Sequence, residues 1–339
     1  MTSHTPNATP DGATVPPAPT EDRGRKLLLR ITLGLLLAGG TLALLAWDHA
    51  GGRQAGLTLL LALAAGAALH EFYGILCAKG QKPAAGLAVF LGVFALLMRA
   101  SNGGRIFGDL GLGVIDDVLA PLFTFLGPVD LFLVGLLLLL AGLVLGRKRT
   151  VEDVIGTVFG IVYVWLPLCL FLDLRALYVA PNRPAGEAAI FVLLVSNKVS
   201  DSAAYLCGTF FGRHKMAPAI SPKKTWEGAA GGLLFGTAAG ALVVWLLMPG
   251  ETRMAWGQVV PGWGTAPEWT GAVVFSALLV AAGQLGDLVE SAIKRWGGVK
   301  DSGRLVPEFG GALDMIDGFL VSAPVAYLFL KCGGLEWVF

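Results

Sequence analysis

The residues best suited to chemistry lie near the C-terminal end of the chain, where acidic and basic side chains interrupt two apolar segments. Asp287, Ser291 and Lys294 are spaced at i, i+4 and i+7, which places them on one face of a continuous helix. Asp314 and Asp317 are three residues apart in the next apolar segment and also share a face. Carboxylates that face lysine and arginine are typical of a divalent metal held beside a polyphosphate.

A second group of charged and hydroxyl side chains lies upstream. Lys198 and Asp201 interrupt an apolar segment, where a charge costs at least about 2.5–3.5 kcal/mol on insertion scales and usually serves a site. The alternative is a mutual i, i+3 ion pair that only stabilises packing. Ser221, Lys223 and Lys224 come just before an expected helix, and a helix N-terminus with nearby lysines suits phosphate. A basic loop of this kind can also act only as a topology determinant.

The composition indicates a membrane protein. The chain has 339 residues, of which 55% are hydrophobic and 14% are charged, whereas a soluble protein carries about 25% charged residues. We therefore predict an all-α, polytopic integral membrane protein. The net charge of +1 suggests no attraction to nucleic acid. The four cysteines form no CxxC pair and the four histidines are dispersed, so a zinc site is not expected.

We predict about nine transmembrane helices, from apolar segments of roughly 20 residues, one of them shorter. The segments are 27–47, 55–77, 84–98, 128–146, 154–174, 188–210, 228–248, 269–290 and 312–332. Residues 1–22 are expected to form a disordered tail, residues 23–180 the N-terminal helices, and residues 181–339 a C-terminal catalytic domain. The apolar stretch 110–126, which carries Asp116 and Asp117, is expected to lie in the interface or, as the alternative, to span.

The distribution of cations predicts the orientation. With the N-terminus in the cytoplasm and nine spans, most lysines and arginines fall on the cytoplasmic side, as the positive-inside rule requires. The charged loops 211–227 and 291–311 then face the cytoplasm, where nucleotides are available.

Two further patterns favour a packing role. Glycines recur every fourth residue in the segment 228–248, and small residues at this spacing more often serve close helix packing than a phosphate cradle. These are Gly228, Gly232, Gly236 and Gly240. His70 and Glu71, near the end of the second span, are more consistent with a helix-end interface pair than with ligands.

Three motifs, in one order, resemble those of the phosphatidate cytidylyltransferases, also called CDP-diacylglycerol synthases. They are Asp201-Ser-Ala-Ala-Tyr205, Ser221-Pro-Lys-Lys-Thr-Trp-Glu-Gly228, and the run from Ser291 through Lys294-Arg295, Lys300-Asp301, Pro307 and Gly310-Gly311 to Asp314 and Asp317. The resemblance covers about residues 190–330. The chain has Phe309 where the family usually has histidine, and Met315 where it usually has arginine; Glu308 and Ala312 also depart from the common residues.

The resemblance implies a reaction between CTP and phosphatidic acid that gives CDP-diacylglycerol and pyrophosphate. A lipid phosphate oxygen would attack the α-phosphorus of CTP in line, and no general base is needed because that phosphate is already largely ionised near pH 7. The acyl chains would stay in the bilayer. The implied localisation is a bacterial inner membrane with the active site facing the cytoplasm.

The resemblance also assigns roles to residues. Mg²⁺ is expected on Asp287 and Asp314, with Asp201 and Asp317 next, and Asp287, Asp314 and Lys294 are the expected catalytic residues. Phosphate groups would be held by a set of hydroxyl and cationic side chains. These are Ser221, Lys223, Lys224, Lys294, Arg295 and Lys300.

Other functions remain open from the sequence. A CTP-dependent lipid kinase of the polyprenol or phytol type would use a similar membrane metal site but release CDP. A transporter of anionic solutes would place its charges near the midplane and often shows repeated halves, which this chain lacks. A catalytically silent, lipid-binding relative is a further alternative, motivated by Phe309 and Met315. The glycine-rich spans are compatible with a homodimer, and intramolecular packing explains them equally well.

Overall fold

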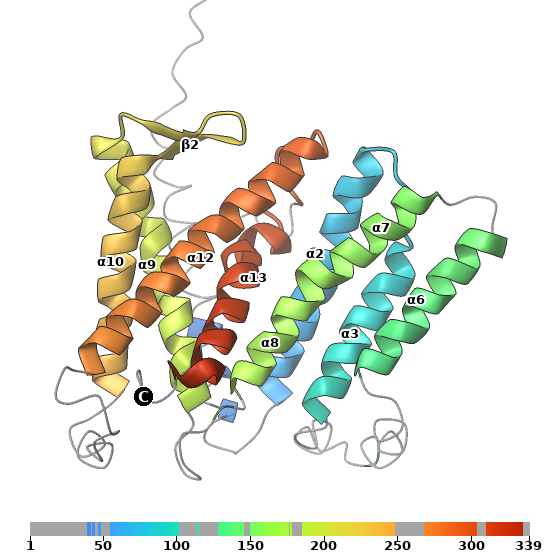
Figure 1. The fold of residues 1–339 in the computed structure, drawn as a ribbon, viewed down its shortest axis with the longest axis horizontal. Coiled ribbons are helices and arrows are strands. Elements are labelled where there is room, and N and C mark those ends of the chain that lie inside the picture. Colours follow the sequence, from blue (N-terminus) through green and yellow to red (C-terminus); the bar gives the residue numbers. More distant parts are fainter. Residues whose placement is uncertain are drawn as a thin grey trace, which may run out of the picture.

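The computed structural model describes residues 39–41, 43–44, 47–48, 55–101, 114, 128–145, 150–175, 177, 185–247, 268–303 and 310–334. Within these residues the protein is a row of helices that lie side by side (Figure 1). The helices are α2 (Ala55–Ala78), α3 (Ala85–Ser101), α6 (Pro128–Leu145), α7 (Val151–Gly160), η1 (Ile161–Trp165), α8 (Leu166–Arg175), α9 (Ala185–Phe211), α10 (Trp226–Leu247), α12 (Glu268–Trp296), α13 (Ala312–Phe329) and η2 (Leu330–Gly334).

Six helical segments are long and apolar enough to cross a membrane. They are Ala55–Ala78, Val151–Arg175, Gly186–Phe211, Trp226–Leu247, Trp269–Trp296 and Ala312–Cys332. The prediction of an all-α, polytopic membrane protein is therefore confirmed. The predicted count of nine is not confirmed. Among the described residues, two of the expected spans form only the shorter apolar helices Ala85–Leu97 and Leu133–Gly142. The expected span 27–47 is described only in part, and the tail 1–22 and all of 110–126 except Val114 lie outside the described residues.

The loop between α9 and α10 forms a β-hairpin, which the sequence analysis did not predict. Strand β1 (Lys215–Ala217) pairs antiparallel with β2 (Ser221–Thr225), with Lys215 opposite Thr225. Thr225 ends the hairpin and begins α10, since its Oγ1 accepts a hydrogen bond of 3.1 Å from the backbone N–H of Gly228. In Figure 1 the hairpin lies at the end of the bundle where α12 also ends. Both charged loops therefore meet at one end of the helices.

Glycines set the distance between α9 and α10. A Cβ atom at Gly236 would lie 2.8 Å from the carbonyl oxygen of Ser196, and one at Gly232 would lie 2.9 Å from that of Ser200. Gly228, Gly232, Gly236 and Gly240 are all buried. The packing interpretation of the four-residue repeat is thus confirmed: the smooth face lets the two backbones touch.

A second close approach joins α12 to α13. A Cβ atom at Gly286 would overlap the carbonyl oxygen of Asp317 and would lie 3.1 Å from the Cα of Gly318. Farther along the same pair, the rings of Phe275 and Phe329 stack with centroids 5.5 Å apart. The contact at Gly286 also holds its neighbour in sequence, Asp287, close to α13.

The opposite end of the bundle is held by a buried ion pair. Arg175, at the end of α8, lies 2.8 Å from Asp48, which is fully buried. The same carboxylate accepts hydrogen bonds of 2.9 Å from the backbone N–H groups of Gly56 and Leu57, at the start of α2. Asp48 therefore satisfies helix donors that have no partner within the helix.

Single glycine-to-alanine substitutions test the packing of α9 on α10. Gly236→Ala should lower the stability by about 1–3 kcal/mol, as overpacking does, because the new methyl group meets a backbone carbonyl. Gly74→Ala on α2 is the matched control, since nothing lies within 4 Å of a Cβ atom there. Thermal unfolding of the two purified variants in detergent measures the difference. Equal midpoints would contradict the close contact.

Candidate active site

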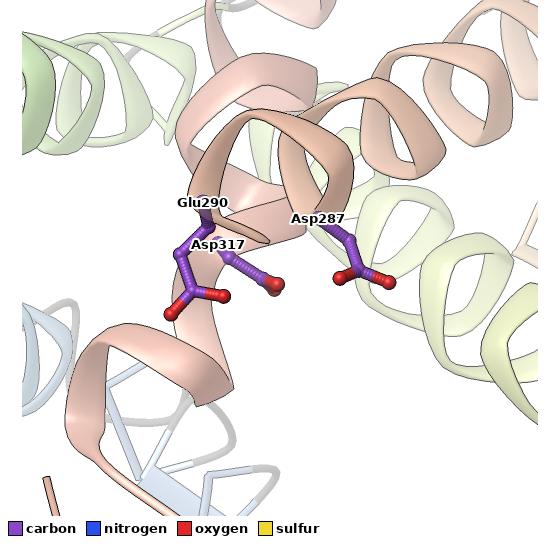
Figure 2. Close-up of side chains that lie close together, drawn as sticks. All are labelled: Asp287, Glu290 and Asp317. Atoms are coloured by element: carbon purple, nitrogen blue, oxygen red, sulfur yellow. The ribbon is translucent and has the colours of Figure 1, made fainter. Parts of the chain in front are cut away.

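Three carboxylates from two helices converge where α12 crosses α13. One carboxylate oxygen from each of Asp287, Glu290 and Asp317 lies within 4.8 Å of the others. Figure 2 shows the three side chains directed toward a common space. Asp287 and Glu290 share a face of α12 at i, i+3, and Asp317 comes from α13. We refer to these three residues as the carboxylate triad.

The triad opens into a strongly acidic cavity of about 360 Å³. Its lining consists of the triad together with Asp201, Gly283, Lys294, Asp301, Gly310, Asp314 and Gly318. Charged groups are costly inside a membrane and usually mark a substrate or ion site. The acids at positions 201, 287, 314 and 317, which the sequence analysis singled out, thus all border one cavity.

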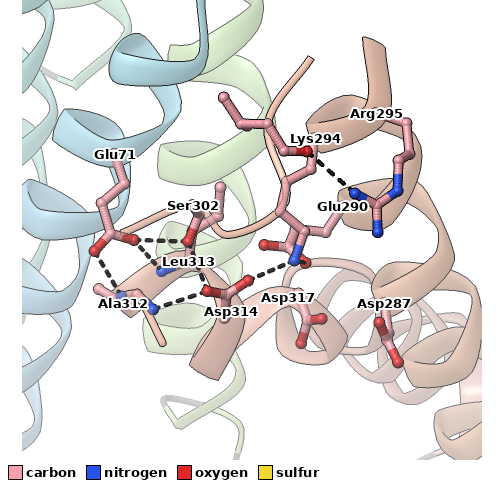
Figure 3. Close-up of polar contacts among 12 residues, drawn as sticks. Glu71, Asp287, Glu290, Lys294, Arg295, Ser302, Ala312, Leu313, Asp314 and Asp317 are labelled. Atoms are coloured by element: carbon pink, nitrogen blue, oxygen red, sulfur yellow. Dashed lines mark hydrogen bonds and ion pairs between the residues drawn. The ribbon is translucent and has the colours of Figure 1, made fainter. Parts of the chain in front are cut away.

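Lys294 lies beside the triad and is held by two carboxylates. Its Nζ is 2.6 Å from Oε2 of Glu290 and 2.5 Å from Oδ1 of Asp314 (Figure 3). The other oxygen of Asp314 accepts hydrogen bonds from the backbone N–H of Gly311, at 2.8 Å, and from the hydroxyl of Ser302, at 2.9 Å. Asp314 therefore lies between the ammonium group of Lys294 and the N-terminus of α13.

The triad has the chemistry of a divalent-cation site. Its donors are all carboxylate oxygens, which suit hard cations such as Mg²⁺. Glu290 is 1% exposed, and within the described part of the chain its Oε1 is buried without a hydrogen-bond partner. A buried carboxylate oxygen left unpaired is costly, and a bound cation would remove that cost. The residues present therefore fit a divalent metal ion.

The hairpin is fastened to the end of α12 by two side chains. Lys224 on β2 lies 2.6 Å from Oδ2 of Asp287, and Arg295 donates hydrogen bonds to the carbonyl oxygens of Ile220, at 3.2 Å, and Val299, at 3.3 Å. These contacts bring Lys224 to the triad. They also give Arg295, an expected phosphate ligand, contacts with the backbone of both charged loops.

The other expected residues lie around the cavity. Asp201 lines it and pairs with Lys198 at 3.6 Å, so the ion pair considered from the sequence exists beside the site. Ser221 is part of β2, and Lys223 and Lys300 are exposed; these three are not among the described residues that line the cavity. Phe309 lies outside the described residues, and Met315 is half-buried in the first turn of α13.

The sequence analysis did not predict the contacts of two residues in this region. Glu290 stands three residues after Asp287 and four before Lys294, so its spacing places it on the same helix face and could have identified it. Glu71 was interpreted, with His70, as a helix-end interface pair rather than a ligand, and the contact of its carboxylate with the start of α13 was not predicted (Figure 3). The sequence gives no signal for that contact, because it joins residues 241 and 242 positions apart.

Comparisons with known proteins identify the family of this chain. A family model described as "Cytidylyltransferase family" matches residues 28–333. The phosphatidate cytidylyltransferase of Mycobacterium leprae is 41% identical over 179 residues, which is 53% of this chain and 50% of that protein. The protein of the same name from Brucella suis is 41% identical over 149 residues, or 44% of this chain and 48% of that protein. The chain thus spans about half the length of the curated relatives it matches.

Because Arg295 holds the hairpin, its removal should make the hairpin more sensitive to protease. Arg295→Ala should make tryptic cleavage after Lys223 or Lys224 about fivefold faster, the increase expected when local opening becomes about 1 kcal/mol easier. Arg213→Ala is the control, because the contact of Arg213 with Glu227 is made by its backbone N–H and survives the change. Mass spectrometry of fragments that begin at 224 or 225 gives the rate. Equal rates in the two variants would show that Arg295 does not hold the hairpin.

Proposed function

We propose, from the premise that this chain belongs to the cytidylyltransferase family, that it transfers CMP from CTP to phosphatidic acid. The products are CDP-diacylglycerol and pyrophosphate. The observation that carries the proposal is the carboxylate triad at an acidic cavity, with Lys224 and Lys294 bound to its members. The lipid substrate is inferred from the names of the relatives, both phosphatidate cytidylyltransferases.

The proposed step is a displacement at phosphorus. An oxygen of the lipid phosphate forms a bond to the α-phosphorus of CTP, the bond from that phosphorus to the α,β-bridging oxygen breaks, and pyrophosphate leaves. Both reactants are anionic, so their repulsion must be cancelled for them to approach. Positioning and charge stabilisation can supply the catalysis, because the lipid phosphate is already ionised.

Different residues of the chain would bind the metal ion, neutralise the phosphates and orient the lysine. Asp287, Glu290 and Asp317 would hold a divalent ion such as Mg²⁺, which when bound neutralises phosphate charge and polarises the phosphoryl group. Lys224 and Lys294 already neutralise two triad members and lie where phosphate oxygens would arrive. Asp314 orients Lys294 in this proposal, and Asp201 stays at the cavity wall as a further cation ligand.

The peripheral cations complete the proposal. Lys223 and Lys300 are exposed, and Ser221 belongs to the hairpin, so they would guide and hold the triphosphate as it enters. The hairpin end of the bundle would face the cytoplasm of a bacterial inner membrane, in line with the distribution of cations. The acyl chains of the lipid would remain among the helices that border the cavity.

A single assay tests the reaction. Purified protein in lipid vesicles or mixed micelles receives phosphatidic acid, Mg²⁺ and CTP labelled in the cytosine ring. The expected products are lipid-linked cytidine and an equal amount of pyrophosphate, both dependent on Mg²⁺. Release of CDP without lipid-linked cytidine would replace the proposal by the kinase alternative, and an absence of turnover by folded protein would refute the transferase.

The triad predicts which variants lose activity. Glu290→Gln and Asp317→Asn should each lower kcat by about 100-fold or more, the size of effect typical for a preorganised electrostatic contact. Glu152→Gln is the control, since Glu152 is exposed in the first turn of α7. Thermal stabilisation by Mg²⁺ or Mn²⁺ should weaken in the two triad variants and persist in the control. Triad variants with full activity and unchanged response to the ion would exclude the triad as the metal site.

A further inference from the structure

Glu71 links the N-terminal helices to the proposed catalytic motif. It lies on α2, and its carboxylate accepts hydrogen bonds of 2.9 Å from the backbone N–H groups of both Ala312 and Leu313. The hydroxyl of Ser302 donates a third bond, of 3.1 Å. All three donors belong to the loop and helix start that carry Asp314 (Figure 3).

The first turn of α13 needs such an acceptor. The leading N–H groups of a helix have no partner within it, and a side-chain oxygen at the N-cap position usually accepts from one of them. The N-cap of α13 is Gly311, which has no side chain to serve. Glu71 supplies the missing acceptor from another helix, and its negative charge interacts favourably with the N-terminal end of the helix dipole.

Two glycines leave the space that Glu71 occupies. A Cβ atom at either Gly303 or Gly311 would overlap the carboxylate of Glu71. Gly311 has φ −85° and ψ 171°, an extended conformation open to any residue, so backbone conformation does not require glycine there. Its lack of a side chain is explained by the carboxylate packed against it.

A continuous set of polar contacts runs from Glu71 to the triad. The hydroxyl of Ser302 bonds to both Glu71 and Asp314, Asp314 bonds to Lys294, and Lys294 bonds to Glu290. Figure 3 shows these side chains as one network from α2 to α12. A shift of the first turn of α13 would therefore move Asp314 and, through it, the ammonium group of Lys294.

We propose that Glu71 is a positioning residue for cytidylyl transfer: it caps α13 from α2 and so fixes Asp314 and Lys294 beside the triad. This inference rests on the function proposed above. According to this inference the site also needs α2. Its other polar groups come from α9, the hairpin, α12, α13 and the loop between α12 and α13.

Replacement of Glu71 tests the proposal. Glu71→Ala should lower kcat by about 10- to 100-fold, the loss that follows from a small misplacement of catalytic groups, and should change the KM for CTP less than kcat. Glu71→Gln keeps one oxygen acceptor and should retain intermediate activity. His70→Ala is the control, because His70 is exposed and adjacent in sequence to Glu71.

A compensating change separates capping from a general loss of stability. Serine at Gly311 places a capping hydroxyl on the helix itself, but in the presence of Glu71 its Cβ would overlap the carboxylate. Gly311→Ser alone should therefore impair activity, whereas Glu71→Ala with Gly311→Ser should recover at least about tenfold over Glu71→Ala. The hydroxyl of Ser302, also close to the new Cβ, can turn about a single bond.

Hydrogen–deuterium exchange gives a readout that does not depend on activity. Glu71→Ala should accelerate exchange in a peptide that covers 311–318 and leave peptides of α10 unchanged, and the double variant should restore protection. If wild type proves inactive, the proposed function fails while exchange still decides the cap. If wild type is active and Glu71→Ala shows wild-type kcat and exchange, the positioning role is overturned and the function stands.

Discussion

The repulsion among carboxylates around one cavity, between helices long and apolar enough to span a membrane, is the constraint on which the rest of the structure depends. Six acids and one lysine are found among the described residues that line the cavity. Charges removed from water cost several kcal/mol each unless they are paired. The pairs are Lys294 with Glu290 and Asp314, Lys224 with Asp287, and Lys198 with Asp201, while the backbone N–H of Gly318 donates to Asp317. Within the described residues, Oε1 of Glu290 is left without a hydrogen-bond partner, and a divalent cation would pair with it.

Convergence of the acids requires helices that touch through their backbones. At Gly286 the α12 and α13 backbones approach so closely that a methyl group would not fit, and Asp287 and Asp317 flank this contact. The same device joins α9 to α10, and the hairpin between these two helices contacts Asp287 through Lys224. Membrane helices lack a strong hydrophobic drive to associate with one another, so close packing of small residues has to hold them together. The glycines thus permit the helix contacts that bring the acids together.

A contact of Glu71 with α13 crosses the expected division of the chain at residue 180. The helices before it contain Glu71, which contacts the first turn of α13, and Tyr73, whose hydroxyl donates to the carbonyl oxygen of Thr157 at 2.8 Å within the same N-terminal part. The N-terminal helices and α13 therefore share one packed apolar core, and Glu71 adds a polar contact to it.

The sequence alone determined the helical membrane architecture, the packing role of the glycine face in segment 228–248, and a set of acids and lysines of which Asp201, Asp287, Lys294, Asp314 and Asp317 line one cavity. These follow from local properties: apolar segment length, four-residue spacing and the cost of intramembrane charge. Only the tertiary structure decided which acids group together, with Glu290 in the triad and Asp314 turned to the start of α13, and only it revealed the hairpin and Glu71. The physical reason is that these depend on helix crossings and on backbone donors left over at a helix end, and both are set by contacts between residues far apart in the chain.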